Sequence, residues 1–171
     1  MKLDKFIQPK APGEAKRIAV AAAEGEEVLT ALQDAVKLGL VEPILVGDGA
    51  AIRGLIEKHG FELGNYEIVD RPTHAAAAAT AVELVKTGEA KVLMKGVLVS
   101  SILMKAILNK ETGIRKSSTL NIVSVIDSPM MDRLLFLSDA GMVLYPTLEQ
   151  KIDIINNCVH VARNTGVELP K

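Results

Sequence analysis

The chain has 171 residues and a formal net charge of -1 at pH 7, and 49% of its residues are hydrophobic but only 3% are aromatic. This length allows one well-buried domain, or one domain and part of another, with a core built from aliphatic residues and methionine. The basic residues are dispersed, which argues against a nucleic-acid surface. The single cysteine, Cys158, excludes an intramolecular disulfide and a CxxC metal site.

The sequence also argues against a membrane protein. It has no apolar run of the roughly 18 residues that a transmembrane helix needs. Asp4, Lys5 and Gln8 interrupt the apolar residues at the start, which is not typical of a signal peptide. We therefore expect a soluble, cytoplasmic protein with no membrane partner.

The first part of the chain predicts strands and helices in alternation. Four continuous apolar runs, each followed by a turn, predict strands buried on both faces. These runs are 16–23, 44–46, 66–69 and 92–94. The stretches between them carry apolar residues at helical spacing, and Thr73 is placed to cap the third helix. Such alternation predicts an α/β fold, a three-layer βαβ parallel sheet with helices on both faces.

The stretch 90–110 predicts a strand, a tight turn and a helix. We expect its strand to be central in the sheet, with Val92 and Leu93 buried. Lys95 and Gly96 follow the strand. A helix N-terminus then presents unpaired N–H groups and a partial positive charge, which suits a phosphate or another anion.

Two hydroxyls, on Ser100 and Ser101, lie at the start of that helix and could donate to a phosphate oxygen. The alternative is a purely structural connection, with Lys95 on the surface and one serine as the N-cap. No complete GxGxxG or GKS pattern is present to decide between the two.

The pattern changes after residue 110. Two apolar runs, 120–126 and 134–137, are joined by a short connection and predict an antiparallel pair. Thr147 and Gln150 have the spacing of a capping box for the last helix. One face of that helix carries apolar residues, which we expect to be buried. They are Leu148, Ile152, Ile155, Val159 and Ala162.

This change of pattern predicts a domain boundary. Residues 1–118 form a parallel-sheet α/β domain in this interpretation. Residues 119–171 form the antiparallel pair and a helix that lead into a second domain, which is incomplete in this chain.

Three segments carry distinctive motifs. They are RIAVAAAEGEEVLTAL at 17–32, VLMKGVLVSSILMKAILNKETGIR at 92–115, and LLFLSDAGMVLYPTLEQK at 134–151. With these motifs the sequence resembles the phosphate acyltransferases, the family of phosphate acetyltransferase and phosphate butyryltransferase. MKG and NKETGIR resemble the butyryl branch more closely. The resemblance runs through the whole chain, which corresponds to about the first half of a family member.

The resemblance implies a reaction and a fold. Family members move an acyl group, butyryl or acetyl, reversibly between coenzyme A and inorganic phosphate, with coenzyme A as a substrate and no bound cofactor. Their fold is similar to that of isocitrate and isopropylmalate dehydrogenases, with two α/β domains, a cleft between them, and a homo-oligomer of two or more copies. The reaction needs a base for the thiol and cations for the phosphate and the developing oxyanion.

The resemblance places those catalytic groups outside this chain. In the family a Ser–Arg pair and a nearby Asp close to the C-terminus are assigned to them, and no position up to Lys171 matches. Catalytic residues are therefore not assigned here. At Lys105 the acetyl branch has an arginine implicated in coenzyme A binding, which a lysine replaces only in part.

The candidate residues for coenzyme A and phosphate share a place after a predicted strand or in a polar connection. They are Lys95, Gly96, Ser100, Ser101, Arg115 and Asp139. Arg115 can hold a phosphate with two hydrogen bonds, or it is a solvated loop residue. Asp139 either contacts a ligand or accepts backbone N–H bonds at its turn. Glu24, after the first strand, leaves the same two possibilities open.

No metal site is predicted. His59, His74 and His160 lie far apart on predicted helices without a common spacing, and each is expected to be a surface or helix-end residue.

Two other functions remain open from the sequence. One is a binding module or assembly subunit that holds coenzyme A or another phosphorylated ligand without turnover. The other is a nicotinamide-dependent dehydrogenase, which the shared fold allows. The lack of a GxGxxG with a following ribose-binding acid argues against the dehydrogenase.

Overall fold

The computed structural model describes residue 3 and residues 15–116 and 118–171. These residues fall into two compact units. Residues 15–115 form the first, called here the α/β unit, and residue 3 with residues 116 and 118–171 forms the second, called the C-terminal unit. The boundary expected after residue 118 stays a prediction.

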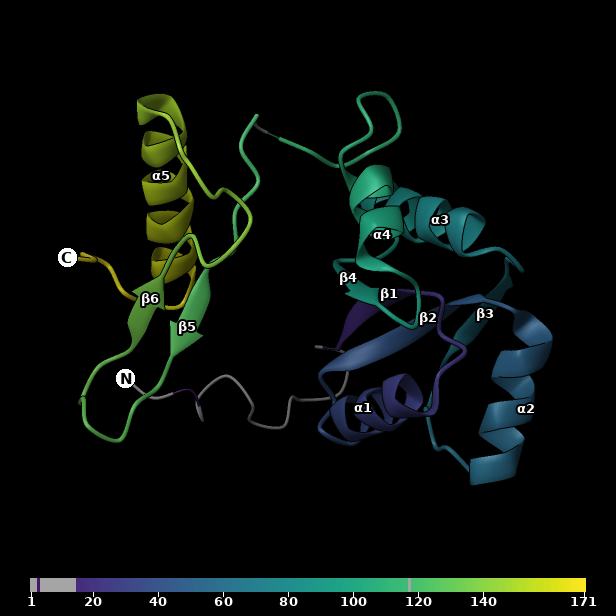
Figure 1. The fold of residues 1–171 in the computed structure, drawn as a ribbon. Helices are drawn as coiled ribbons and strands as arrows, with labels where there is room; N and C mark the ends of the chain where they lie inside the picture. Colours follow the sequence, from purple (N-terminus) through teal and green to yellow (C-terminus); the bar gives the residue numbers. More distant parts are fainter. Residues whose placement is uncertain (1–2, 4–14, 117) are drawn as a thin grey trace. The chain divides into compact units, whose positions relative to one another are not determined.

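The α/β unit alternates strands and helices as the sequence predicts (Figure 1). Its elements are β1 (Lys16–Ala21), α1 (Glu26–Lys37), β2 (Val41–Gly47), α2 (Gly49–His59), β3 (Glu67–Asp70), α3 (His74–Thr87), β4 (Val92–Lys95) and α4 (Ser100–Ile107). The strands pair in parallel in the order β3-β2-β1-β4. The α/β class and the parallel sheet are thus confirmed.

Two apolar layers enclose the sheet. Side chains of Ala19 and Ile44 pack with α3 and α4, whereas Val20 and Leu45 pack with α1 and α2. Neighbouring strand residues point to opposite faces, so the continuous apolar runs serve both layers. In Figure 1, α3 and α4 lie above the sheet and α1 lies below it.

The alanine run of α3 packs directly on the sheet. Ala77, Ala78 and Ala81 are fully buried, and α3 contacts both β1 and β2. Thr73 caps this helix, because its hydroxyl accepts from the N–H of Ala76 at 3.3 Å, as predicted. The small side chains let the helix approach the strands closely, and alanine also favours the helix itself.

The expected central position of β4 is wrong. Within the described residues β4 pairs with β1 alone and ends the strand order, while β1 lies between β2 and β4. Val92 is 40% exposed and Leu93 is only half-buried, whereas Ala19 and Val20 of β1 are fully buried. An apolar run indicates a strand, but the run does not say which strands lie on its two sides.

The C-terminal unit holds the antiparallel pair and one long helix. Its elements are β5 (Ser124–Ile126), β6 (Leu135–Leu137) and α5 (Leu148–Asn164). β5 and β6 pair antiparallel, as predicted, but both strands are shorter than the apolar runs. The capping box is confirmed: Thr147 accepts from the Gln150 N–H, and the Gln150 side chain accepts from the Thr147 N–H.

The expected buried face of α5 is wrong in part. Leu148 and Ile155 are 70% and 61% exposed, and Ile152 is 51% exposed, while Ile154 and Ala162 are buried. The helix carries apolar residues on two adjoining stripes, so its periodicity does not decide which stripe packs inward. Contact with β6 decides it.

Among the described helices, none is both long and apolar enough to cross a membrane.

Candidate ligand site at the carboxyl edge of the sheet

The strand order creates a switch point between β1 and β4. The chain leaves β1 toward β2 and β3, and then returns through α3 to place β4 on the other side of β1. In open α/β sheets, ligands bind beyond the carboxyl ends of the two strands where the order reverses. In the α/β unit this is the edge formed by the turns after Ala21 and Lys95.

Backbone hydrogen bonds join these two turns. The N–H of Gly96 donates to the carbonyl of Ala21 at 2.8 Å, and the N–H of Val97 donates to that of Ala22 at 2.9 Å. A Cβ on Gly96 would lie 1.8 Å from the Ala22 carbonyl oxygen. Glycine is therefore required for the close approach of these two backbones.

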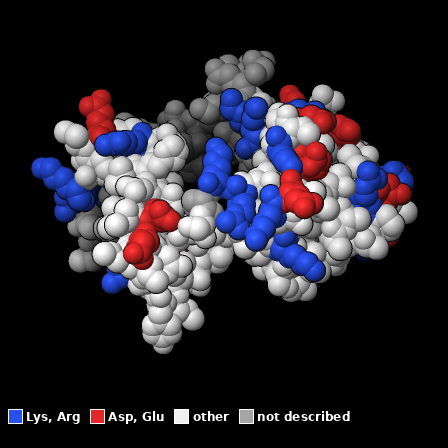
Figure 2. Space-filling view, turned by 90° about the horizontal axis from the view of Figure 1, so that it is seen from above, with Lys and Arg blue, Asp and Glu red and all other residues white. Residues whose placement is uncertain are grey.

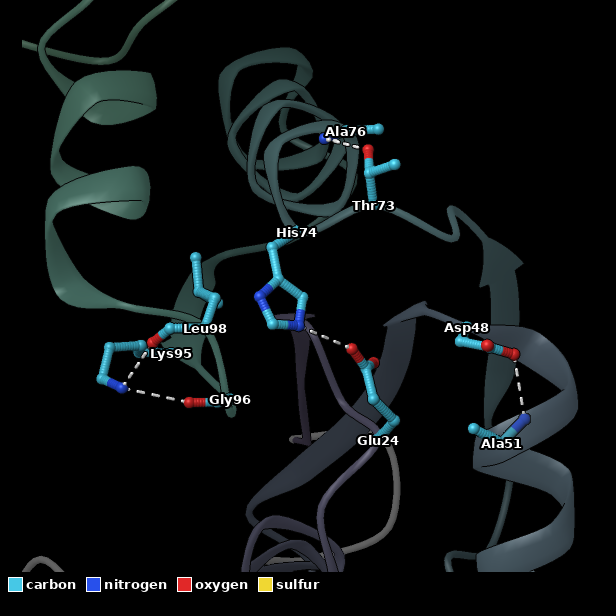
Figure 3. A network of polar contacts seen from close by, with 9 residues as sticks. All are labelled: Glu24, Asp48, Ala51, Thr73, His74, Ala76, Lys95, Gly96 and Leu98. Atoms are coloured by element: carbon cyan, nitrogen blue, oxygen red, sulfur yellow. Dashed lines mark hydrogen bonds and ion pairs between the residues drawn. The ribbon is translucent and has the colours of Figure 1, made fainter.

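Lys95 folds back onto its own turn (Figure 3). Its ammonium donates to the carbonyl of Gly96 at 3.1 Å and to that of Leu98 at 2.9 Å. These bonds give the lysine a structural role, because they fix the turn that leads into α4. They also hold the positive charge at the carboxyl edge, and an ammonium has a third hydrogen to donate.

The start of α4 has no side-chain cap. Val99 is the N-cap, and Ser100 and Ser101 are the first two helical residues, both exposed. The alternative that one of these serines caps the helix is therefore wrong. The first-turn N–H groups and the two hydroxyls remain as donors next to Lys95, and an anion is the natural partner for such a helix end.

Basic residues continue along and beyond α4. Between Lys95 and Arg115, four basic side chains stand against one acidic residue, Glu111. Figure 2 views the molecule from the side of α3 and α4 and shows Lys and Arg gathered on this face. A surface of this sign attracts phosphate groups.

The connection after α4 is well anchored. The N–H of Ile114 donates to the carbonyl of Ile107 at 3.1 Å, and the Lys86 ammonium donates to that of Glu111 at 2.7 Å. Arg115 comes directly after this anchored segment, and its side chain is exposed.

Asp139 lies in the C-terminal unit and is engaged by its own turn. Its carboxylate accepts from the N–H of Ile122 at 2.9 Å and from the N–H groups of Met142 and Val143. These backbone bonds, that of Ile122 first, lower the pKa of Asp139 below its ordinary value of 3.8. The geometry supports the structural alternative for this residue, and contact with a ligand stays a prediction.

A pair that sequence reasoning missed lies at the same edge as Lys95. Glu24 follows β1, His74 opens α3, and the Glu24 Oε1 lies 3.3 Å from the His74 Nε2 (Figure 3). His74 was expected only as a surface or helix-end residue. A signal for the pair was present, since both residues follow parallel strands closely and carboxyl ends of parallel strands meet at one edge.

No three His, Cys, Asp or Glu side chains of the described ranges come together as a metal site would need. The site candidates thus separate into groups. Lys95, Gly96, Ser100 and Ser101 lie together at the turn before α4, Arg115 follows the end of α4, and Asp139 belongs to the C-terminal unit.

Comparison with protein families matches residues 3–79 and 73–171 to the family described as phosphate acetyl/butaryl transferase. The chain belongs to this family. The sequence resemblance is thereby confirmed over nearly the whole chain.

Curated relatives carry both family names. A phosphate butyryltransferase of Clostridium acetobutylicum is 45% identical over 92% of this chain and 52% of its own length. A phosphate acetyltransferase of Thermotoga maritima is 41% identical over 100% of this chain and 58% of its own length. The chain therefore spans little more than half the length of these two relatives.

A solved structure has the same fold. A branched-chain phosphotransacylase from Enterococcus faecalis superposes with a TM-score of 0.72 at 24% sequence identity, covering 91% of this chain and 54% of that one.

Proposed function

We propose that this chain supplies the N-terminal part of an enzyme that transfers a butyryl or acetyl group between coenzyme A and inorganic phosphate. The observation that carries the proposal is the family match over residues 3–79 and 73–171. Relatives named for both acyl groups match at similar identity, so the acyl chain is left open between the two.

The α/β unit supplies groups for the phosphates of the substrates. The start of α4 offers backbone N–H groups and the hydroxyls of Ser100 and Ser101, beside the ammonium of Lys95. Gly96 lets the two turns meet there, and Arg115 adds a guanidinium that can bind a phosphate oxygen pair. We propose these residues of the α/β unit as the substrate-binding set, and Asp139 of the C-terminal unit as a separate candidate for substrate contact.

Further properties complete the proposal. The whole protein has the two-domain architecture of isocitrate and isopropylmalate dehydrogenases, assembles as a homo-oligomer and works in the cytoplasm. Coenzyme A is a substrate, and the proposal includes no resident cofactor, no metal and no nucleic-acid or membrane partner.

A second candidate is a module that binds coenzyme A without turnover. The proposed phosphate-binding groups lie within the part of the family length that this chain matches, which is 52% of the butyryltransferase. The resemblance assigns the base and the oxyanion-stabilising arginine to the remaining part of that length.

Calorimetry with coenzyme A tests the shared part of both candidates. Wild type should bind, and Lys95→Ala should bind about tenfold more weakly, since a lost charge-assisted hydrogen bond is worth roughly 1.4 kcal/mol. Lys58→Ala is the matched control, because Lys58 is an exposed lysine in the last turn of α2.

A thermal melt of each variant separates loss of binding from loss of the fold. Equal affinities of wild type and Lys95→Ala would remove Lys95 from the site. Absence of binding in wild type would remove the proposed site from the α/β unit.

A further inference from the structure

Glu24 and His74 form a contact that the binding set above does not use. The two side chains come from different turns of the carboxyl edge, one after β1 and the other after β3. The Glu24 side chain is 16% exposed and that of His74 is 42% exposed, so the carboxylate is mostly buried and the ring is reachable from solvent.

One oxygen of Glu24 has an unusual environment. Oε2 is buried and has no hydrogen-bond partner among the described residues. It rests against the backbone of Gly47, where a Cβ would lie 2.0 Å away. A carboxylate held this way has lost hydration on one oxygen. The hydrogen bond between its other oxygen and the ring is therefore strengthened.

This contact orients the imidazole. A carboxylate oxygen accepts hydrogen bonds, so the nitrogen that faces it, Nε2, carries a proton. In the neutral ring the other nitrogen, Nδ1, then holds the lone pair. Figure 3 shows Nδ1 on the side of the ring away from Glu24, and no described residue forms a hydrogen bond with it.

We infer that Glu24 positions His74 so that Nδ1 accepts a hydrogen bond from the uncharged arm of coenzyme A. That arm carries amide, hydroxyl and thiol hydrogens. The inference rests on the proposed function and adds a second subsite to it. Phosphates belong to Lys95 and the start of α4, because an anion at the ring itself would lie close to the Glu24 carboxylate.

A hollow that can take part of an uncharged arm begins at Gly25, the residue after Glu24. This open hollow of about 720 Å³ has apolar lining from Val97 and from Val28 and Ala31 of α1, and polar lining from Thr30 and from three carboxylates, those of Glu26, Glu27 and Asp34. Val97 is 47% exposed, so apolar surface is available to a ligand there. The carboxylates and the Thr30 hydroxyl can accept hydrogen bonds from the amide and hydroxyl groups of an uncharged arm, and the carboxylates disfavour a phosphate there.

Three variants test the arrangement. In His74→Gln the side-chain amide can keep the contact with Glu24 but offers no group at the place of Nδ1. Glu24→Gln keeps the shape of the carboxylate and removes its charge. Gly47→Ala displaces Glu24 by its Cβ, and Gly54→Ala is the control, because no heavy atom lies within 4 Å of the added methyl.

The first measurement is the tautomer of His74, read from long-range ¹H–¹⁵N spectra of the 171-residue chain above the titration of its histidines. Wild type and Gly54→Ala should show the proton on Nε2, and Glu24→Gln and Gly47→Ala should show a mixture. A proton on Nδ1 in wild type, or an unchanged spectrum in both variants, would overturn the positioning role of Glu24.

The second measurement is calorimetry with pantetheine, coenzyme A and inorganic phosphate. His74→Gln should lower the affinity for pantetheine and for coenzyme A by about tenfold, which corresponds to the loss of one hydrogen bond. Its affinity for phosphate should be unchanged. If His74→Gln binds pantetheine and coenzyme A as tightly as wild type does, the inference is overturned and the proposed function still stands. If wild type binds none of the three probes, the inference fails together with the proposed function.

Discussion

The turn after β4 depends on two neighbouring residues with opposite requirements. Gly96 is needed for its missing side chain, because the Ala22 carbonyl occupies the space that a Cβ would take. Lys95 is needed for its long one, which reaches back to two carbonyls of the turn. The sequence pair Lys-Gly thus encodes a turn geometry as well as a charge.

Gly96→Ala is expected to destabilise the chain by about 1–3 kcal/mol or more, because the Cβ would meet a backbone oxygen that cannot move by itself. Urea unfolding followed by circular dichroism measures the change. Gly54→Ala should be neutral or stabilising, since alanine is the better helix former. Equal midpoints for Gly96→Ala and wild type would contradict the close approach of the two turns.

Asp139→Asn is expected to reduce stability at neutral pH and to match wild type in acid. The folded pKa is lowered by backbone N–H donors, so the carboxylate stabilises the fold above its ordinary value of 3.8. That contribution disappears as the pH falls through the lowered folded pKa. The melting temperatures of the two proteins should approach one another as the pH is lowered through this range. A difference in melting temperature that stays constant with pH would contradict the interpretation.

The helices α4 and α5 differ in the hydrogen bonds at their first turns. We expect the start of α5 to contribute to stability and the start of α4 to bind a ligand. α5 starts with a complete capping box, whereas α4 starts at Val99 without a side-chain cap. An uncapped helix end at the carboxyl edge leaves its N–H groups for water or a ligand. We expect the two ends to respond differently to the loss of a hydroxyl.

Thr147→Ala should lower the unfolding free energy by about 1 kcal/mol, the usual value of an N-cap. Ser100→Ala should leave the melting temperature almost unchanged and weaken the binding of coenzyme A measured by calorimetry. Chemical denaturation and titration of both variants provide the comparison. A large loss of stability in Ser100→Ala would show that the hydroxyl supports the helix after all.

Local signals predicted most elements, whereas contacts between distant residues were predicted less well. Thr73 and Thr147 mark helix starts by side-chain hydrogen bonds that involve only nearby residues, and the structure has both as expected. The position of β4 in the sheet and the buried stripe of α5 depend on distant partners. For the same reason, the contact between Glu24 and His74 was not predicted, although each residue was noted.

For the molecule as a whole, this chain matches only part of the length of its relatives. It covers 52% and 58% of the two transferases compared above. The resemblance assigns the oxyanion-stabilising arginine to the remaining part, and loss of one such group commonly costs 10²–10³ in rate. The exposed apolar residues of α5, including Leu148 and Ile155, also favour association.

The purified 171-residue chain is therefore expected to show little or no acyl transfer from acetyl- or butyryl-coenzyme A to phosphate, measured by release of free thiol. Sedimentation should show self-association. Turnover at a rate ordinary for enzymes, roughly 1–10³ per second, would place the catalytic groups within these residues and refute their assignment to the remainder.

The pairing of β1 with β4 sets an order of events during synthesis and folding. β1 joins β2 across one helix, but Ile18 must wait for its partner Val92 until two further helices and another strand have been made. Closing that long loop costs more chain entropy than the earlier pairings. The pairing of these two strands, and with it the candidate ligand site beyond their carboxyl ends, is then the last part of the sheet to form. We therefore expect a nascent chain to protect the amides of β1 and β2 from hydrogen exchange before it can bind coenzyme A.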